Sequence, residues 1–350
     1  MCSSTSETKS KPAHTQTYSS KNMHISTLVP LPVRNTLDLC RGHSVGRGVV
    51  VCGDLGLLVI SCWRELQVFA LPEDIARGGV HGDLGTPREL VHLRSILGGS
   101  ATPMEFQFCH GSGNMAFTVG CGDAISSRLL LVTDCDISGR DAVHVIDVVS
   151  GTHVGYMAAP GTIMNPRGVA TQNSLAAVSC YTSVRLFEGS GATWAAVRTI
   201  AVAIAGFGVS ADGLRLVVAE LHHRRLSIFC AKDGALLRHM ALPGDVYPFN
   251  NIEECVISDG DGSRAGWVMC REGGLVAIAD NENANGTDVV AERRKLYFHL
   301  FGLTTLPGVG LVVRFAKGLQ FFATPDAIAM ASMSSCKVAW MVAVCRRGLL

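Results

Sequence analysis

A unit of four short apolar runs, separated by polar or glycine-containing turns, recurs along this chain. It is clearest in residues 117–158, 165–202 and 206–243, and looser copies lie on both sides of them. The runs are rich in Val, Ile, Leu and Phe and are too short for helices, so each is interpreted as a strand. A lone four-stranded meander cannot bury both of its faces, whereas several meanders packed radially can. The repeat, at a spacing of about 40 to 50 residues, therefore predicts an all-β fold, a β-propeller with six blades.

The same spacing divides the chain into a tail and one domain. Residues 1–22 are rich in Ser and Thr and offer little to bury, which is typical of a disordered tail. A single propeller domain is expected over residues 23–346, with an insertion carrying a short helix at about 72–103. The apolar run at 23–31 is the candidate strand that completes a blade of the other terminus. Residues 326–345 can be read as strand or as helix.

Composition limits the partners and the compartment. A formal net charge of +1 gives no broad field to steer the protein onto nucleic acid or an acidic membrane. The 13 cysteines are odd in number and contain no C-x-x-C pair. They are interpreted as reduced thiols inside apolar runs. A secretory signal is not recognisable, and the most apolar stretch, residues 327–345, contains three serines and Lys337. A cytoplasmic, monomeric domain without a membrane span is expected.

One unit has a recognisable pattern beyond its apolar runs. Its elements are an inner strand followed by Asp-Gly, a strand ending in an acidic residue, an Arg that opens the next strand, a Phe near that strand's end, and a second Asp-Gly. These are Gly208–Ser210, Asp212–Gly213, Val217–Glu220, Arg225–Phe229 and Asp233–Gly234. The unit resembles the NHL repeat, although Glu220 stands where that family usually has Asp. The resemblance implies an NHL-type propeller, a fold that can bind other proteins and, in some members, RNA.

The candidate binding residues are His222, His223, Arg224 and Arg225, at the turn between the second and third strands of this unit. Three interpretations stay open. The residues can be a solvated turn, a local patch in which arginines grip phosphate, or a metal site. Adjacent residues on an extended strand point to opposite faces, which disfavours two neighbouring histidines on one ion. We therefore predict no metal, no cofactor and no catalytic residue here.

Two further patterns resemble functional sites but lack the required context. Gly42–Gly46 matches G-x-S-x-G, yet strands and turns rather than a helix are expected after it. The acidic run Asp280–Asp288 has Ala291 where a Ca²⁺ loop needs its last glutamate. The first is interpreted as a chance match and the second as a hairpin loop.

The function predicted on this basis is a non-catalytic scaffold that binds other proteins on the face made by loops between blades. Two alternatives remain. In a propeller hydrolase or lyase, Glu254, Asn250 and Asn251 could reach a metal in the central channel. An RNA-binding propeller would need basic residues from several blades on one face.

Overall fold

The computed structural model describes slightly more than half of the chain. The described residues are 29–35, 48–62, 65–80, 84–97, 114–118, 129–135, 141–202, 209–211, 215–220, 223, 225–241, 252–257, 265–270, 274–280, 289–295, 300–306, 308–315, 318–324 and 328. They form short antiparallel strands and one short helix, α1 (Glu73–Ala76). None of the described helical residues belongs to a segment with the length and hydropathy needed to span a bilayer.

In the described residues the strands pair into five four-stranded sheets and one five-stranded sheet. The first sheet comprises β2 (Val33–Asn35), β3 (Val49–Cys52), β4 (Leu57–Cys62), β5 (Glu65–Ala70) and β6 (Arg88–Leu97). The second comprises β7 (Met115–Phe117), β8 (Leu129–Asp134), β9 (Ala142–Asp147) and β10 (Thr152–Ala158). The third comprises β11 (Gly168–Gln172), β12 (Leu175–Ser179), β13 (Ser183–Ser190) and β14 (Thr193–Ala201).

The remaining three sheets follow the same order, except at the end of the chain. The fourth comprises β15 (Val209–Ala211), β16 (Arg215–Glu220), β17 (Arg225–Cys230) and β18 (Leu236–Ala241). The fifth comprises β19 (Ile252–Ile257), β20 (Ala265–Cys270), β21 (Gly274–Asp280) and β22 (Val289–Lys295). The sixth comprises β23 (Leu300–Leu306), β24 (Gly310–Phe315), β25 (Gly318–Ala323) and β1 (Val29–Leu31).

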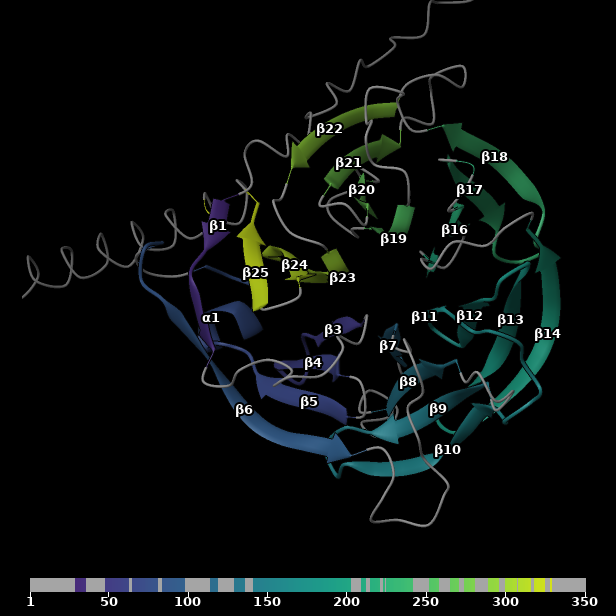
Figure 1. The fold of residues 1–350 in the computed structure, drawn as a ribbon, viewed down its shortest axis with the longest axis horizontal. Helices are drawn as coiled ribbons and strands as arrows, with labels where there is room; N and C mark the ends of the chain where they lie inside the picture. Colours follow the sequence, from purple (N-terminus) through teal and green to yellow (C-terminus); the bar gives the residue numbers. More distant parts are fainter. Residues whose placement is uncertain are drawn as a thin grey trace, which may run out of the picture.

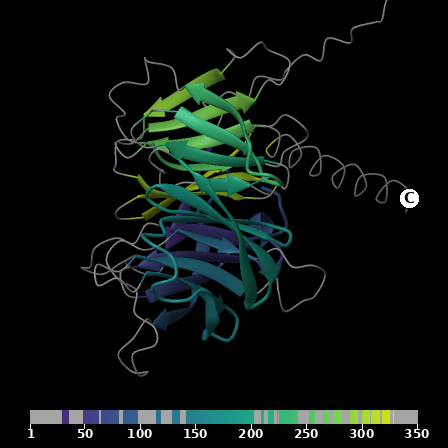
Figure 2. The ribbon, with the colours of Figure 1, turned by 90° about the vertical axis from the view of Figure 1, so that its right-hand side faces the viewer.

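The sheets are arranged radially about a central axis. In Figure 1 the strands nearest the centre are β3, β7, β11, β15, β19 and β23, and strands such as β6, β10, β14, β18 and β22 lie at the periphery. Figure 2 shows the same ring from its side, where the strands run through its thickness. The predicted all-β, β-propeller fold is confirmed.

The hydrophobic core is divided among the interfaces between neighbouring sheets. All six residues of β4, and all six of β8, are buried. Burial of consecutive residues means that both faces of a strand are covered, here by the sheets on either side. Four clusters of buried apolar residues fill the spaces between the first and second, second and third, third and fourth, and sixth and first sheets. This explains why the sequence shows short continuous apolar runs rather than clean alternation.

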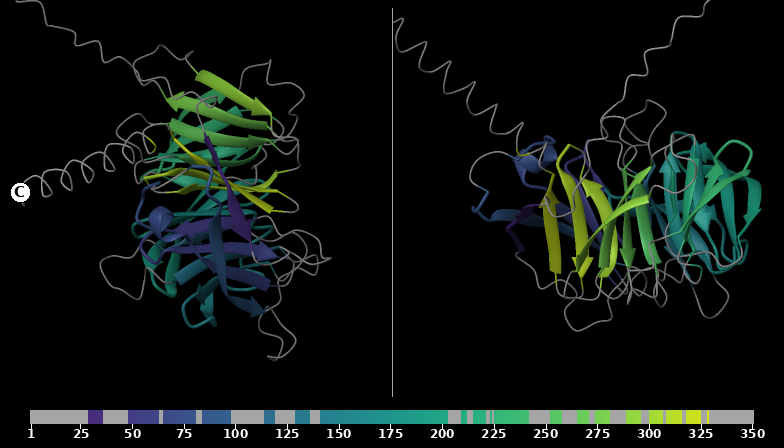
Figure 3. Two further views of the ribbon diagram at one scale, coloured as in Figure 1. Left: turned by 90° about the vertical axis from the view of Figure 1, so that its left-hand side faces the viewer. Right: turned by 90° about the horizontal axis from the view of Figure 1, so that it is seen from above.

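The two ends of the chain meet in the contact between the sixth and first sheets. β1 pairs antiparallel with β25, and Leu31, which is fully buried, lies opposite Phe321. Figure 3 shows β1 alongside the strands of the last sheet, and β2 then continues to the edge of the first sheet. Arg314 on β24 is 2% exposed, and its Nη1 donates to the carbonyl oxygens of Gly48 at 2.8 Å and Ser61 at 2.5 Å. Residues far apart in sequence therefore join these two sheets.

The turn between the third and fourth strands packs against the preceding sheet. In the fourth sheet, Asp233 Oδ1 accepts a hydrogen bond from the Ala235 amide at 2.9 Å, and Gly234 has φ +71°. A side chain at Gly234 would place its Cβ 3.0 Å from Arg198 and 3.1 Å from Ile200, both on β14. Glycine is needed here for its backbone angle and for close packing, which explains the Asp-Gly pair of the repeat.

One of two sequence predictions about strand order needs correction. The segment expected to be an insertion at 72–103 does contain the helix α1, but its residues 88–97 form β6, the fourth strand of the first sheet. Within the N-terminal run 23–31, residues 29–31 form β1, the fourth strand of the sixth sheet, which confirms that this run completes a blade of the other terminus. Apart from Ile328, the C-terminal run 326–345 lies outside the described residues, as does the tail 1–22.

Candidate functional site

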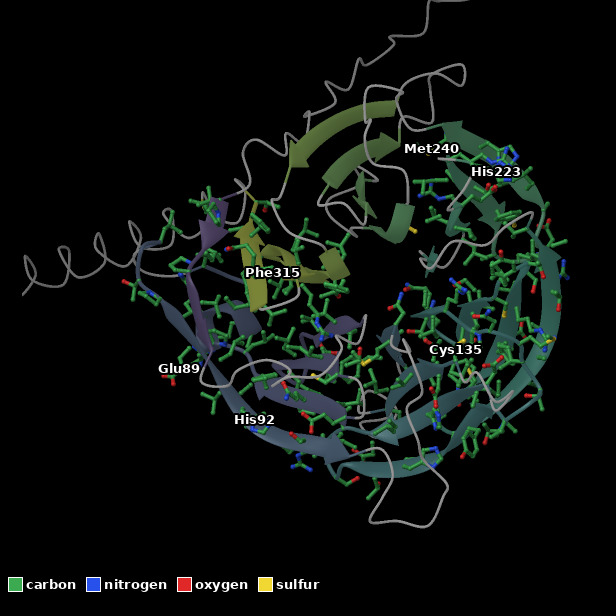
Figure 4. The ribbon with its side chains drawn as sticks, viewed as in Figure 1. Glu89, His92, Cys135, His223, Met240 and Phe315 are labelled. Carbon is green, nitrogen blue, oxygen red and sulfur yellow. The ribbon has the colours of Figure 1, made fainter. Side chains whose placement is uncertain are left out.

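Of the candidate residues, His223 lies in the turn between β16 and β17, as predicted, and Arg225 begins β17. β16 ends at Glu220 and β17 begins at Arg225, and these two residues pair directly across the strands. His223 is exposed in the turn, whereas His222 and Arg224 lie outside the described residues. Figure 4 shows His223 in the outer part of the fourth sheet.

Arg225 is engaged by an acidic residue of its own sheet. Its Nε and Nη2 lie 3.0 and 2.9 Å from Oε2 of Glu220, which is almost completely buried. Burial of a carboxylate is costly unless it is paired and hydrogen-bonded. The guanidinium charge of Arg225 therefore serves to compensate Glu220, and Arg225 is a poor candidate for gripping an external phosphate.

A serine and a histidine complete this network. Ser227 Oγ donates to Oε1 of Glu220 and lies 2.8 Å from Nδ1 of His239 on β18. Because a hydroxyl has only one hydrogen, Nδ1 of His239 must be the donor to Ser227. The group has the composition of a hydrolytic triad, but Ser227 is 0% exposed and cannot meet a substrate. Its role is to join the three outer strands of the fourth sheet.

The second sheet has an equivalent network in the same place. Asp134 ends β8 as Glu220 ends β16, and its Oδ2 lies 3.3 Å from Nε2 of His144. His144 Nδ1 lies 3.2 Å from Nε2 of His153 on β10, and both rings contact Tyr156. Burial, and secondarily His144, lowers the pKa of His153 to about 4. Recurrence of the network in two sheets identifies it as part of the repeat's architecture.

A different cluster lies where the second and third sheets meet. Because strands alternate in direction, the turns between second and third strands share one face of the ring with the connectors between sheets. We call this the loop face; its described residues include the connector 159–167, the turn 181–182 and His223. Within the connector, Asn165 has φ +50°, an angle that favours Asn or Gly.

Side-chain hydrogen bonds hold Asn165 in place. Its main-chain N–H donates to Oδ2 of Asp141 at 2.6 Å. Its own Oδ1 accepts from Nε of Arg167 at 3.0 Å and from Sγ of Cys135 at 3.1 Å. Nη1 of Arg185 on β13 fastens the connector from the other side by donating to the carbonyl of Thr162 at 2.6 Å. The connector is thus held by groups from both sheets, and Figure 4 shows Cys135 at this junction.

Four side chains at this junction form what we call the junction patch: Met164, Arg167, Tyr181 and Arg185. Met164 is 77% exposed and Tyr181 is 47% exposed. The guanidinium carbon of Arg167 lies 5.4 Å from the centre of the Tyr181 ring, within the range of a cation–π contact. The junction patch therefore presents exposed apolar side chains and guanidinium groups from the connector, the turn 181–182 and β13.

The nearby thiols are not suited to nucleophilic chemistry. Burial raises the pKa of Cys135 to about 11, with the carboxylate of Asp141 the next cause. Burial likewise raises the pKa of Cys180 to about 11. Only a thiolate is strongly nucleophilic. The six cysteines whose state is described are all free, and four of them are buried, in agreement with their interpretation as small core residues.

The inner strands bear on the alternative of a metal in the central channel. Five of them, β3, β7, β11, β15 and β23, contain no Asp, Glu or His. The sixth, β19, contains Glu253 and Glu254, whose side chains are not described, and Asn250 and Asn251 lie outside the described residues. No group of three metal-ligating residues is present in the described part of the chain.

The two weaker sequence patterns are placed as follows. Gly42–Gly46 lies outside the described residues. Asp280 pairs with Val289 across β21 and β22, so the acidic run connects two adjacent antiparallel strands. This agrees with its interpretation as a hairpin loop.

Comparison with known proteins identifies the fold and no family. No family model matches the chain, and no curated protein matches it. Among solved structures 1174 chains match, so this fold alone selects no function. One of them is Kuenenia stuttgartiensis hydrazine synthase, with a TM-score of 0.51, 13% sequence identity, and coverage of 78% of this chain and 74% of that chain. The likeness is one of fold alone.

Proposed function

We propose that this protein is a non-catalytic protein-interaction scaffold, built on a closed six-bladed propeller of the NHL type, and that partners dock on its loop face. The ring closure is supported by the pairing of β1 with β25 and by the buried cluster shared by the sixth and first sheets. The observation that carries the binding function is the junction patch, with Met164 and Tyr181 exposed beside Arg167.

The composition of the junction patch suits protein binding. Tyr and Arg are enriched among residues that dominate binding energy, and Met adapts its shape to irregular partner surfaces. A large apolar side chain as exposed as Met164 stabilises nothing in the folded chain, and burial against a partner would be favourable by about 25 cal/mol per Å². Two anchors of this kind, from the connector and from the turn between β12 and β13, are a typical start of a docking site.

The rigidity of the connector supports the same function. Asn165 is held by Asp141, Arg167 and Cys135, so little conformational entropy remains to be lost when a partner binds.

The alternatives have less support. A channel metal would need ligands from several inner strands, and five of them supply no carboxylate or imidazole. RNA binding would need free cations on several sheets, whereas Arg225 is already paired with Glu220. The free, buried cysteines favour a reducing compartment, which for this chain would be the cytoplasm.

Site-specific cross-linking in cells would test the proposal. A photo-reactive amino acid would replace Tyr181, or as a control Leu237, which is 53% exposed on the peripheral strand β18. We expect discrete protein adducts from position 181 that are absent from position 237 and that Met164→Asp abolishes. Purified protein that holds a stoichiometric metal, or that yields only RNA adducts at position 181, would contradict a non-catalytic protein scaffold.

A further inference from the structure

We propose that the outer edge of β14 binds an extended, uncharged segment of a partner protein, which is added to the third sheet as a fifth strand. The part of the strand concerned, Thr193–Val197, is called the β14 edge. It lies on the periphery of the ring, and it contains none of the residues of the junction patch (Figure 1). The inference therefore goes beyond the proposed function and does not rest on it.

The β14 edge is open to solvent. β14 is the last strand of the third sheet, and among the described residues no strand pairs with its outer side. Thr193 and the run 195–199 are exposed, so solvent reaches both faces of the strand. An edge strand presents a row of N–H and C=O groups to which the backbone of another chain can bind.

The β14 edge is also held in an extended conformation. Trp194 packs against the buried cluster between the second and third sheets, and its Nε1 donates to the carbonyl of Gly191 at 2.9 Å. The run 193–196 pairs with 187–190 on β13 without a register shift. A strand that is already fixed loses little conformational entropy when a partner strand is added.

Other outer edges have features that oppose such pairing. β1 has three residues and includes Pro30. The outer side of β6 is covered at its start by β2, and Arg94 follows further along the strand. β10 has two register shifts within seven residues. Short length, proline, charge and bulges are the features by which natural proteins protect the edges of their sheets.

Charge is present on the last two outer strands as well. β18 contains Arg238 and has a register shift, and β22 contains the charged run 292–295. β14 has one register shift, at Val197, and its first charged residue is Arg198. The β14 edge contains neither charge nor proline. It is therefore the least protected of the outer edges that the structure describes.

The side chains of the β14 edge indicate which kind of segment fits. Thr193, Trp194 and Val197 are of residue types that favour strands. Ala195 and Ala196 point to opposite faces and are small, so they leave room on both faces for larger side chains of an added strand. β-Branched side chains stabilise such cross-strand pairs, whereas a charge finds no opposite charge along this run. An uncharged segment rich in β-branched residues therefore matches the β14 edge.

A second copy of this chain fits the β14 edge less well. Two rings would meet along one short strand each, because the periphery of a ring curves away on both sides of β14 (Figure 1). A stable interface buries about 1,200 Å² or more, and a contact between two short edges gives less. An extended segment of a partner is not restricted in this way, because only its backbone must reach the edge.

Fluorescence anisotropy with the full chain tests the proposal. The probe is a short labelled peptide of alternating valine and threonine. The same peptide N-methylated at every residue keeps the side chains but has no N–H to donate, and a glycine–serine peptide of equal length lacks the β-branched side chains. We expect the valine–threonine peptide to bind at millimolar concentration or below, and each control to bind at least about tenfold more weakly.

Paired substitutions assign the binding to the β14 edge. Ala195→Lys together with Ala196→Lys adds the kind of charge that β22 carries, and should weaken binding at least about tenfold. Leu236→Lys together with Leu237→Lys makes the same change at two exposed residues of β18, and should change binding less than about twofold. Because all four positions are exposed, both variants should unfold at the same urea concentration as the unsubstituted protein.

Four outcomes would overturn the proposal. They are no binding of the valine–threonine peptide at millimolar concentration, equal binding of its N-methylated form, no effect of the β14 substitutions, and an equal loss in the β18 variant. Sedimentation that finds a dimer of the unsubstituted chain, and a monomer of the β14 variant, would assign the edge to a second copy instead.

Cross-linking separates this inference from the proposed function. Adducts at position 181 should be the same in the β14 variant as in the unsubstituted protein, because the loop face does not contain the β14 edge. If those adducts form but the peptide does not bind, the inference fails and the proposed function stands. If the peptide binds at the β14 edge but no adducts form at position 181, the proposed function fails and the inference stands.

Discussion

Leu31→Ala provides a stringent test of how the ring is closed. Leu31 is fully buried in the cluster between the sixth and first sheets, although it belongs to a strand of only three residues. Its main-chain oxygen accepts from Nε2 of Gln320 at 3.2 Å, and its strand pairs with β25. The alanine variant leaves the strand's backbone pairing unchanged and removes only buried apolar atoms.

The expected loss of stability follows from that burial. Each buried methylene is worth about 0.8 kcal/mol, so three carbons give about 2.4 kcal/mol. The cavity left behind adds about 1 kcal/mol, for a total of about 3 to 4 kcal/mol. Val29→Ala is the matched control on the same strand: Val29 is only partly buried and opposite Ala323, so its loss should stay near or below about 1 kcal/mol.

Urea denaturation followed by fluorescence and by circular dichroism measures both variants. Two probes are needed because sheets in a repeat fold can unfold separately. A lower midpoint with an unchanged slope for Leu31→Ala is the expected result. If Leu31→Ala costs no more than Val29→Ala, the N-terminal strand does not contribute to the core and the closure described here is wrong.

The other predictions concern the polar networks and the connector. Burial lowers the pKa of His153 to about 4, against about 6.5 in the unfolded chain. Because the unfolded chain takes up a proton first, the stability of the fold should decrease as pH drops from about 6.5 toward 4. Because His153 is partly exposed, the loss of stability should be about 1 kcal/mol. It is measured as the urea denaturation midpoint at a series of pH values. A His153→Gln variant whose midpoint depends on pH as steeply as that of the unsubstituted protein would contradict it. Glu220→Gln should cost about 1 to 2 kcal/mol, since Arg225 can still reach water. Glu89→Gln, at an exposed residue of β6, should cost less than about 0.5 kcal/mol, and equal denaturation midpoints for the two variants would refute this. Asn165→Ala should be about 1 kcal/mol less stable than Asn165→Gly because of its φ of +50°, as judged by thermal unfolding; the reverse order would be inconsistent with a fixed connector.

Local patterns predicted much of this fold. The turn between β16 and β17 was located from residue types, and the N-terminal apolar run was assigned to a blade of the other terminus because propellers need closure. The fourth strand of the first sheet was missed because a helix and turns precede it, which gives the whole segment the pattern of an insertion. Composition could not decide whether the apolar run at 327–345 is a strand or a helix, because a strand buried on both faces and a buried helix give the same continuous apolar pattern.

The candidate site was less predictable, for two physical reasons. Glu220 and Arg225 flank a four-residue turn, so their pairing across a hairpin could have been inferred, and with it the loss of Arg225 as a phosphate ligand. The junction patch gave no such signal. Met164 and Arg167 come from a connector and Tyr181 and Arg185 from the next sheet, so only the packing of two sheets brings them together.

Docking at the loop face can be tested by hydrogen exchange on the full chain, with and without a partner recovered through position 181. We expect binding to protect the connector 159–167 and the segment 181–185, while the turn at 231–235 on the opposite face exchanges as before. Protection of that opposite turn or of the peripheral strands, with no change in the connector, would contradict docking at the loop face.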